Sequence, residues 1–90
     1  MRIWFKLWKD TKLKKELTVV RNENDTRTHK VLNAVEEAVH AFDLPVPIWL
    51  DKNIKDFKRS SRCRFYQDSF IETIDYDYLE IHVLEEDMNE

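Results

Sequence analysis

The chain has 90 residues, a net charge of −3 and no glycine, whereas an average chain of this length would carry about six glycines. Because the P-loop, the dinucleotide-binding fingerprint and the nucleophile elbow each need glycine at fixed positions, these enzyme signatures are excluded. No apolar run approaches the roughly 18 residues that span a bilayer, so no membrane association is expected.

The size and composition predict one small, soluble, cytoplasmic domain. Charged residues make up 37% of the chain, which is typical of a heavily solvated surface. The N-terminal stretch Met1–Lys9 lacks the long apolar segment and the small-residue cleavage site of a secretory signal. The single cysteine, Cys63, excludes an intramolecular disulfide and fits a reducing compartment. Nothing in the sequence distinguishes a chromosomal product from a phage or plasmid product.

Charge is strongly segregated along the chain. Residues 1–21 carry a net charge of +5, and residues 22–50 carry a net charge of −3. Residues 51–66 carry +4, whereas residues 67–90 contain nine acidic side chains, no lysine or arginine, and a net charge of −9. Opposed blocks of this kind favour contacts between regions of opposite sign, within one chain or between chains.

The first residues predict a strand with two different faces. Apolar and other side chains alternate over residues 3–8, so the two sets point to opposite sides of the strand. Trp4, Lys6 and Trp8 lie on the side opposite the aliphatic and phenylalanine residues. Aromatic and β-branched residues also favour strands, which supports the same interpretation.

A second strand is predicted over residues 17–20, with Leu13 as an earlier candidate start. A helical start over residues 12–17 is the alternative. The polar residues 9–12 form the connecting turn. Because this turn offers neither glycine nor asparagine at its centre, we expect a loop longer than the two-residue type I′ turn.

Two helices are expected next. Apolar residues recur at helical spacing along one face of residues 26–43, which predicts a long amphipathic helix. The helix ends before Pro45, because proline pushes the preceding residue out of the helical conformation. A shorter helix is predicted over residues 51–60, with Asp51 as its N-cap and cations around its polar side.

Two further strands complete the fold. Apolar and polar side chains alternate over residues 62–67 and again over residues 78–84. The element order β-β-α-(α)-β-β predicts an α+β fold in which the long helix packs on one face of a four-stranded, mostly antiparallel sheet. We expect a single domain over residues 1–84 and a frayed acidic tail over residues 85–90.

Cys63 is expected to be buried and structural. It lies between two arginines, and cationic neighbours can lower the pKa of a thiol. In a strand, however, adjacent side chains point to opposite faces, so Cys63 should face the helix while Arg62 and Arg64 face away. Free cysteine is also among the most buried residue types.

No metal site and no cofactor is predicted. Glu36 and His40 are spaced i, i+4 with Asp43 one turn further on, but clusters of cysteine and histidine with ligand spacing are missing. Asp75 and Asp77 lack the glycine and the regular spacing of a calcium loop, so an acidic turn is favoured.

An enzyme is the weakest of three functional hypotheses. Its site would be assembled from four residues that can share one sheet face: Tyr66, Tyr78, Glu80 and His82. Nothing in the sequence indicates a pocket there, and the sequence predicts no catalytic residue.

The lead hypothesis is a non-enzymatic protein that binds another protein or a second copy of itself. Trp4, Lys6, Trp8 and Tyr66 are expected on the sheet face opposite the long helix, and tryptophan is enriched in binding hot spots. Exposed contiguous apolar surface usually marks an interface. The alternative interpretation is structural, with the second helix or residues 45–50 covering both tryptophans.

Nucleic-acid binding is the alternative function. The candidate patch consists of five cations with aromatic residues nearby: Lys55, Lys58, Arg59, Arg62 and Arg64. A basic surface with aromatics is typical of single-strand binding. The acidic overall charge and the absence of a glycine-containing RNA-recognition motif argue against it, and pairing of these cations with the acidic last strand is the structural alternative.

Overall fold

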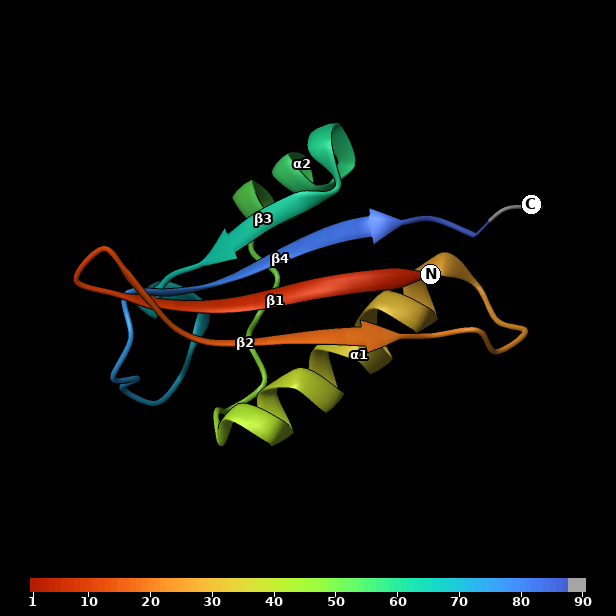
Figure 1. The fold of residues 1–90 in the computed structure, drawn as a ribbon. Helices are drawn as coiled ribbons and strands as arrows, with labels where there is room; N and C mark the ends of the chain where they lie inside the picture. Colours follow the sequence, from red (N-terminus) through yellow and green to blue (C-terminus); the bar gives the residue numbers. More distant parts are fainter. Residues whose placement is uncertain (88–90) are drawn as a thin grey trace.

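The computed structural model describes residues 1–87 and contains four strands, two α-helices and one 3₁₀ turn there. Figure 1 shows the strands side by side, with the long helix behind the sheet and the short helix beside one edge strand. In chain order the elements are β1 (Arg2–Lys9), β2 (Lys12–Val20), α1 (Arg27–Phe42), α2 (Asp51–Ser60), β3 (Arg62–Phe65), η1 (Gln67–Ser69) and β4 (Tyr78–Glu85).

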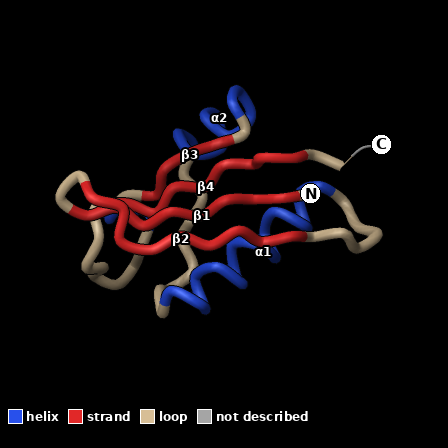
Figure 2. Tube along the Cα trace, viewed as in Figure 1, coloured by secondary structure: helices blue, strands red, loops and turns tan. Residues whose placement is uncertain are grey.

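The four strands form one sheet in the order β2-β1-β4-β3, and every neighbouring pair is antiparallel. The two central strands, β1 and β4, come from opposite ends of the chain (Figure 2). Phe5 marks the middle of the sheet, because it pairs with Leu17 of β2 and with Ile81 of β4. The predicted α+β class and four-stranded antiparallel sheet are confirmed.

The core lies between the sheet and its helices. One side of each central strand is fully buried, and Phe5, Leu79 and Ile81 have no exposed surface. Burying each such side chain contributes on the order of 1.5–3 kcal/mol. The facing residues of α1 are apolar at helical spacing: Val31, Ala34, Val35, Ala38, Val39 and Phe42.

Capping residues set the limits of α1. The Thr26 hydroxyl accepts a hydrogen bond from the His29 backbone N–H at 3.1 Å, which satisfies one free donor of the first turn. At the other end, Asp43 adopts a left-handed φ of 58°, and its N–H donates to the His40 carbonyl at 3.2 Å. Pro45 lies two residues after Asp43, so the helix ends before the proline, as the sequence predicts.

The turn between β1 and β2 differs from the prediction. Lys9 pairs with Lys12, so the loop holds only Asp10 and Thr11, and the helical alternative for the start of β2 is wrong. Both loop residues have positive φ, 52° and 63°, as in a type I′ turn. The Asp10 N–H donates to the Asp77 carboxylate at 2.9 Å. This tertiary contact supports a turn that the local residue types do not favour.

The short helix α2 matches the predicted range, but its N-cap is Leu50 rather than Asp51. Leucine has no side-chain acceptor. Instead, the Asn53 Oδ1 accepts a hydrogen bond from the Leu50 N–H at 3.0 Å and another from the Ser69 hydroxyl at 3.2 Å. The Asn53 Nδ2 donates to the Arg64 carbonyl at 2.8 Å. One buried amide therefore joins α2 to β3 and η1.

Residues 85–87, at the start of the predicted acidic tail, make defined contacts with the rest of the chain. Glu85 is the last residue of β4. Glu86 accepts two hydrogen bonds from the Arg27 guanidinium, at 3.0 and 2.9 Å, and Asp87 lies 2.7 Å from Lys30. These ion pairs hold the segment against the start of α1. The remainder of the predicted tail lies outside the described residues.

Candidate interaction surfaces

The sheet face away from α1 brings together the residues predicted as an interaction face. The alternation of β1 and its registers with β2 and β4 place these side chains opposite the core. We call this surface the open face. Its members are Leu13, Glu16, Thr18 and Val20 of β2, Arg2, Trp4, Lys6 and Trp8 of β1, Tyr78, Glu80, His82 and Leu84 of β4, Arg62 and Arg64 of β3, and Tyr66 directly after β3.

In the part of the chain that the structure describes, no helix or connecting segment covers the open face (Figures 1 and 2). Phe57 of α2 belongs to the core on the other side. Trp49, from the segment predicted as an alternative cover, packs edge to face on Phe57 and Phe65, with ring centroids 5.3 and 4.9 Å apart. Phe65 points from β3 into the core, so the covering interpretation is wrong.

Three aromatic rings form a continuous cluster at one end of the open face. The Tyr78 ring lies 6.3 Å from the Trp8 ring and 5.2 Å from the Tyr66 ring, measured between centroids. The Arg64 guanidinium lies 4.7 Å from the centroid of Tyr78, which is a cation–π contact. Tyr66 is 40% exposed, so the cluster remains accessible from solvent.

Glu80 organises the centre of the open face. Its carboxylate accepts a hydrogen bond from the Trp8 Nε1–H at 3.1 Å and lies 3.3 Å from the Lys6 ammonium and 3.5 Å from the Arg64 Nε. Burial by itself raises the pKa of this carboxyl. The hydrogen bonds from Lys6 and Trp8 and the charges of Lys6 and Arg64 outweigh burial, so the pKa is lowered. Lys6 also stands 3.8 Å from the Trp4 ring centroid, so both tryptophans are held from within the chain.

The four residues of the enzyme hypothesis all lie on the open face. For two of them, Glu80 and His82, the surrounding contacts indicate a structural role. Glu80 already uses its carboxylate in the contacts above. Burial lowers the pKa of His82, and the positive charges of Arg62 and Lys6 lower it further. Both effects disfavour the charged form of the His82 imidazole.

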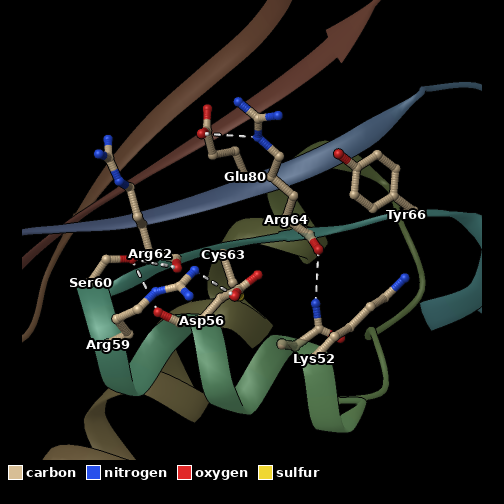
Figure 3. Close-up of a pocket in the computed structure, with 10 residues that line it drawn as sticks. Lys52, Asp56, Arg59, Ser60, Arg62, Cys63, Arg64, Tyr66 and Glu80 are labelled. Carbon is tan, nitrogen blue, oxygen red and sulfur yellow. Dashed lines mark hydrogen bonds and ion pairs between the residues drawn. The ribbon is translucent and has the colours of Figure 1, made fainter.

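A basic hollow of about 470 Å³ lies between α2 and β3 (Figure 3). It is lined by Arg59, Arg62 and Arg64, which are three of the five cations predicted as a nucleic-acid patch. Lys52 and Tyr66 line it as well, and neither residue was part of that predicted patch. Four lining residues of the basic hollow, Arg62, Arg64, Tyr66 and Glu80, also belong to the open face, so the two surfaces overlap.

The other two predicted cations lie elsewhere on α2. Lys55 and Lys58 do not line the basic hollow. Lys58 instead lines an apolar hollow of about 350 Å³ between the helices, together with Leu32 and Ile54. A helix directs successive side chains around its whole circumference, so cations that are close in sequence separate in space.

The basic hollow contains one cation without a carboxylate partner. Arg59 and Lys52 pair with nearby aspartates at 3.0 and 2.7 Å, and Arg64 pairs with Glu80 at 3.5 Å. Among residues 1–87, no carboxylate lies within 4.0 Å of the Arg62 guanidinium. Exposed ion pairs of this kind contribute little stability, typically about 0–1 kcal/mol, so a ligand can displace them at small cost.

The walls of the basic hollow also close the free edge of β3. An edge strand presents unpaired backbone groups that can template association with other chains. The Asn53 Nδ2 donates to the Arg64 carbonyl at 2.8 Å, and the Ser60 hydroxyl donates to the Arg62 carbonyl at 3.4 Å. The opposite edge strand, β2, carries three lysines, a pattern that discourages pairing between strands.

Cys63 is buried, as predicted, and is 5% exposed. Burial, with a smaller contribution from the Asp56 carboxylate, raises the pKa of the Cys63 thiol to about 12. The flanking residues Arg62 and Arg64 point to the opposite side of the strand. The thiol therefore stays protonated at neutral pH and packs as a small apolar side chain.

Residues 1–87 contain no group of three or more His, Cys, Asp or Glu side chains placed to hold a metal ion. His29 instead pairs with Asp25 at 2.9 Å, at the start of α1. No helix in the same range is both long enough and apolar enough to cross a bilayer.

No protein-family model, no curated protein and no solved structure matches this chain. Among residues 1–87, the open face and the basic hollow are the surfaces that contain the residues predicted to contact a partner.

Proposed function

We propose that this protein works by binding another protein through its open face. The observation that carries the proposal is a sheet face that presents four aromatic side chains and that no helix or loop of residues 1–87 covers. Tryptophan, tyrosine and arginine are the residues most enriched in interface hot spots, and this face carries all three. Leu13, Val20 and Leu84 are 39, 54 and 43% exposed at its margins, which widens the apolar surface.

Preorganisation of the open face supports the same proposal. The Trp4 Nε1–H donates to Glu16 at 3.0 Å, and the Trp8 Nε1–H donates to Glu80 at 3.1 Å. Ordering a mobile side chain at an interface costs about 0.5–1.5 kcal/mol, and these rings are already ordered. Their polar atoms are also satisfied, so a partner has to supply only apolar and aromatic contacts.

Crosslinking from two positions tests the proposal. Thr18 is exposed and lies beside Trp4 on the open face, whereas Glu36 is exposed on the outer side of α1. We expect a photo-crosslinking amino acid at Thr18 to give discrete protein adducts in cells that produce the chain, as seen by gel mobility and mass spectrometry. The matched control at Glu36 should give none. Equal adducts from both positions, or no adduct from Thr18, would contradict the proposal.

The basic hollow supports a second candidate function, the binding of single-stranded nucleic acid. Arg62 offers a guanidinium with no carboxylate partner among residues 1–87, and Tyr66 offers an exposed ring at the rim. Single-strand binding combines cations along the phosphate backbone with rings on which bases stack. This candidate uses three of the five predicted cations and leaves out Lys55 and Lys58.

Salt dependence tests the second candidate. Arg62→Ala is expected to weaken the binding of a labelled oligothymidylate and to reduce the slope of log K against log salt by about 0.7, the value for one phosphate contact with a single strand. Lys55→Ala removes a charge of the same sign from outside the hollow and should leave the slope unchanged. Fluorescence anisotropy measures both. Equal losses in the two variants, or no binding by the wild type at low salt, would remove this candidate.

A further inference from the structure

The registers of the sheet give the open face a charge pattern that is complementary to itself. One row of neighbouring side chains crosses the sheet from β2 to β3, in the order Glu16, Lys6, Glu80 and Arg64. The charges along this row alternate: negative, positive, negative, positive. A second copy is placed by a rotation of 180° about an axis parallel to the strands. Its open face then faces the open face of the first copy, and its charged row runs in the reverse order. Each acid then faces a base of the second copy.

The neighbouring rows are compatible with the same arrangement. Trp8 and Tyr78 are cross-strand neighbours in the two central strands. After the rotation, Trp8 of each copy therefore faces Tyr78 of the other copy. Thr18 and Arg62 lie at opposite ends of another row, so the arginine faces a threonine rather than a second arginine. Aromatic pairs contribute about 0.5–1.5 kcal/mol beyond the burial of their area. No pair of like charges meets in these rows.

The outer members of the charged row determine the specificity of this contact. Lys6 and Glu80 already pair within one chain at 3.3 Å, and both side chains are largely buried. Glu16 is exposed and the Arg64 side chain is 51% exposed, so their charges are available to a second copy. Packed sheets cross at about 30°, and the long side chains of the outer strands can span the displacement that this angle produces.

We infer that the open face binds a second copy of this chain, face to face about a two-fold axis parallel to the strands. The inference rests on the proposed function and names its partner. In the dimer, Glu16 of each copy lies opposite Arg64 of the other. A chain of this size buries only about 60–65% of its unfolded surface. A second copy supplies the layer that the uncovered side of the sheet lacks.

Charge reversal and mixing test the inference. Glu16→Lys places a lysine opposite Arg64 of the second copy, and Arg64→Glu places a glutamate opposite Glu16. Each variant alone is expected to raise the dissociation constant of the dimer at least tenfold, because like charges meet twice. An equimolar mixture restores opposite charges at both contacts, so a heterodimer should form with close to the original affinity. Analytical ultracentrifugation of the full chain, with one variant tagged, measures all four cases.

Two controls keep the result interpretable. Glu36→Lys makes the same charge change on the exposed side of α1 and should leave the dimer intact. Arg64→Glu places a second acid beside Glu80, so its fold is checked by circular dichroism. Glu16→Lys removes the acceptor of the Trp4 Nε1–H and lies beside Lys6, so its fold is checked in the same way. Where Arg64→Glu fails to fold, a folded Glu16→Lys variant that dissociates supports the inference, and one that dimerises like the wild type overturns it.

Three outcomes would overturn the inference: a monomeric wild type at all accessible concentrations, single variants that dimerise like the wild type, and a mixture of folded variants that stays monomeric. A monomeric wild type that still gives crosslinks from Thr18 to other proteins would overturn this inference alone. The proposed function would then stand with a different partner.

Discussion

Replacing Asn53 by alanine is expected to lower the free energy of unfolding by about 3 kcal/mol. The Asn53 side chain is 1% exposed and holds the Leu50 N–H, the Ser69 hydroxyl and the Arg64 carbonyl. Alanine leaves these three groups without their partner, and each buried unpaired group costs about 1–3 kcal/mol. Water reaches the partly buried groups, so the summed cost for the three groups stays near the lower end of this range, at about 1 kcal/mol each. The melting temperature should fall by roughly 15 °C for a domain of this size.

Urea denaturation measures the free energy of unfolding of Asn53→Ala, and two further variants serve as references. Ser69→Ala removes one of the three hydrogen bonds and should cost about 1 kcal/mol. Asn33→Ala changes an exposed asparagine of α1 and should stay within about 0.5 kcal/mol of the wild type. If Asn53→Ala costs no more than Ser69→Ala, the amide does not join α2 to β3 in the way described above.

Glu80→Ala is expected to lower the free energy of unfolding by about 2–3 kcal/mol near neutral pH. The substitution leaves the Trp8 Nε1–H without its acceptor and the Lys6 ammonium without its counter-charge. The Lys6 side chain is only 14% exposed, so water compensates the lost charge incompletely. Removing one partner of a largely buried ion pair is more destabilising than removing one partner of an exposed pair.

Glu80→Gln isolates the charge of this residue. The pKa of Glu80 is lowered in the folded chain, so its ionisation stabilises the fold above the unfolded-state pKa. That stabilisation is lost as the pH falls through the lowered folded-state value. The difference in stability between the wild type and Glu80→Gln should therefore be largest above about pH 4.3, the ordinary pKa of a glutamate, and should shrink as the pH falls further.

Glu16→Gln is the matched control for this experiment. Glu16 also accepts a hydrogen bond from a tryptophan on the open face, but it is exposed. Its neutralisation should change the stability by less than about 1 kcal/mol at every pH. Denaturation curves between pH 3 and pH 7 measure both variants. A difference between the wild type and Glu80→Gln that does not depend on pH would contradict the ion pairs described for Glu80.

The alternation of side chains in β1 and β4 and the helical spacing in α1 were readable from the sequence. These patterns depend only on where successive side chains point in a strand or a helix, and burial of the apolar set then selects the core side. The burial of Cys63 followed from the same rule, because Arg62 and Arg64 alternate with it. The end of α1 was also predictable, because proline pushes the preceding residue out of the helical conformation and Pro45 follows the helix.

The departures from prediction all involve contacts between distant segments. The two-residue turn of the first hairpin is held by Asp77, which comes from the loop before β4. Asn53 replaces a side-chain N-cap because Ser69 and the β3 backbone meet it in the core. Local residue preference contains no information about such partners.

The sequence by itself determined the α+β class and the placement of Trp4 and Trp8 opposite the core, because both follow from the periodicity of single segments. Only the tertiary structure decided that this face stays uncovered and that Arg62 lines a hollow from which Lys55 is absent. It also decided that Glu16 and Arg64 stand in one row. These features depend on strand register and on the side where the helices pack, which are set by the summed burial of the whole core and not by any one segment.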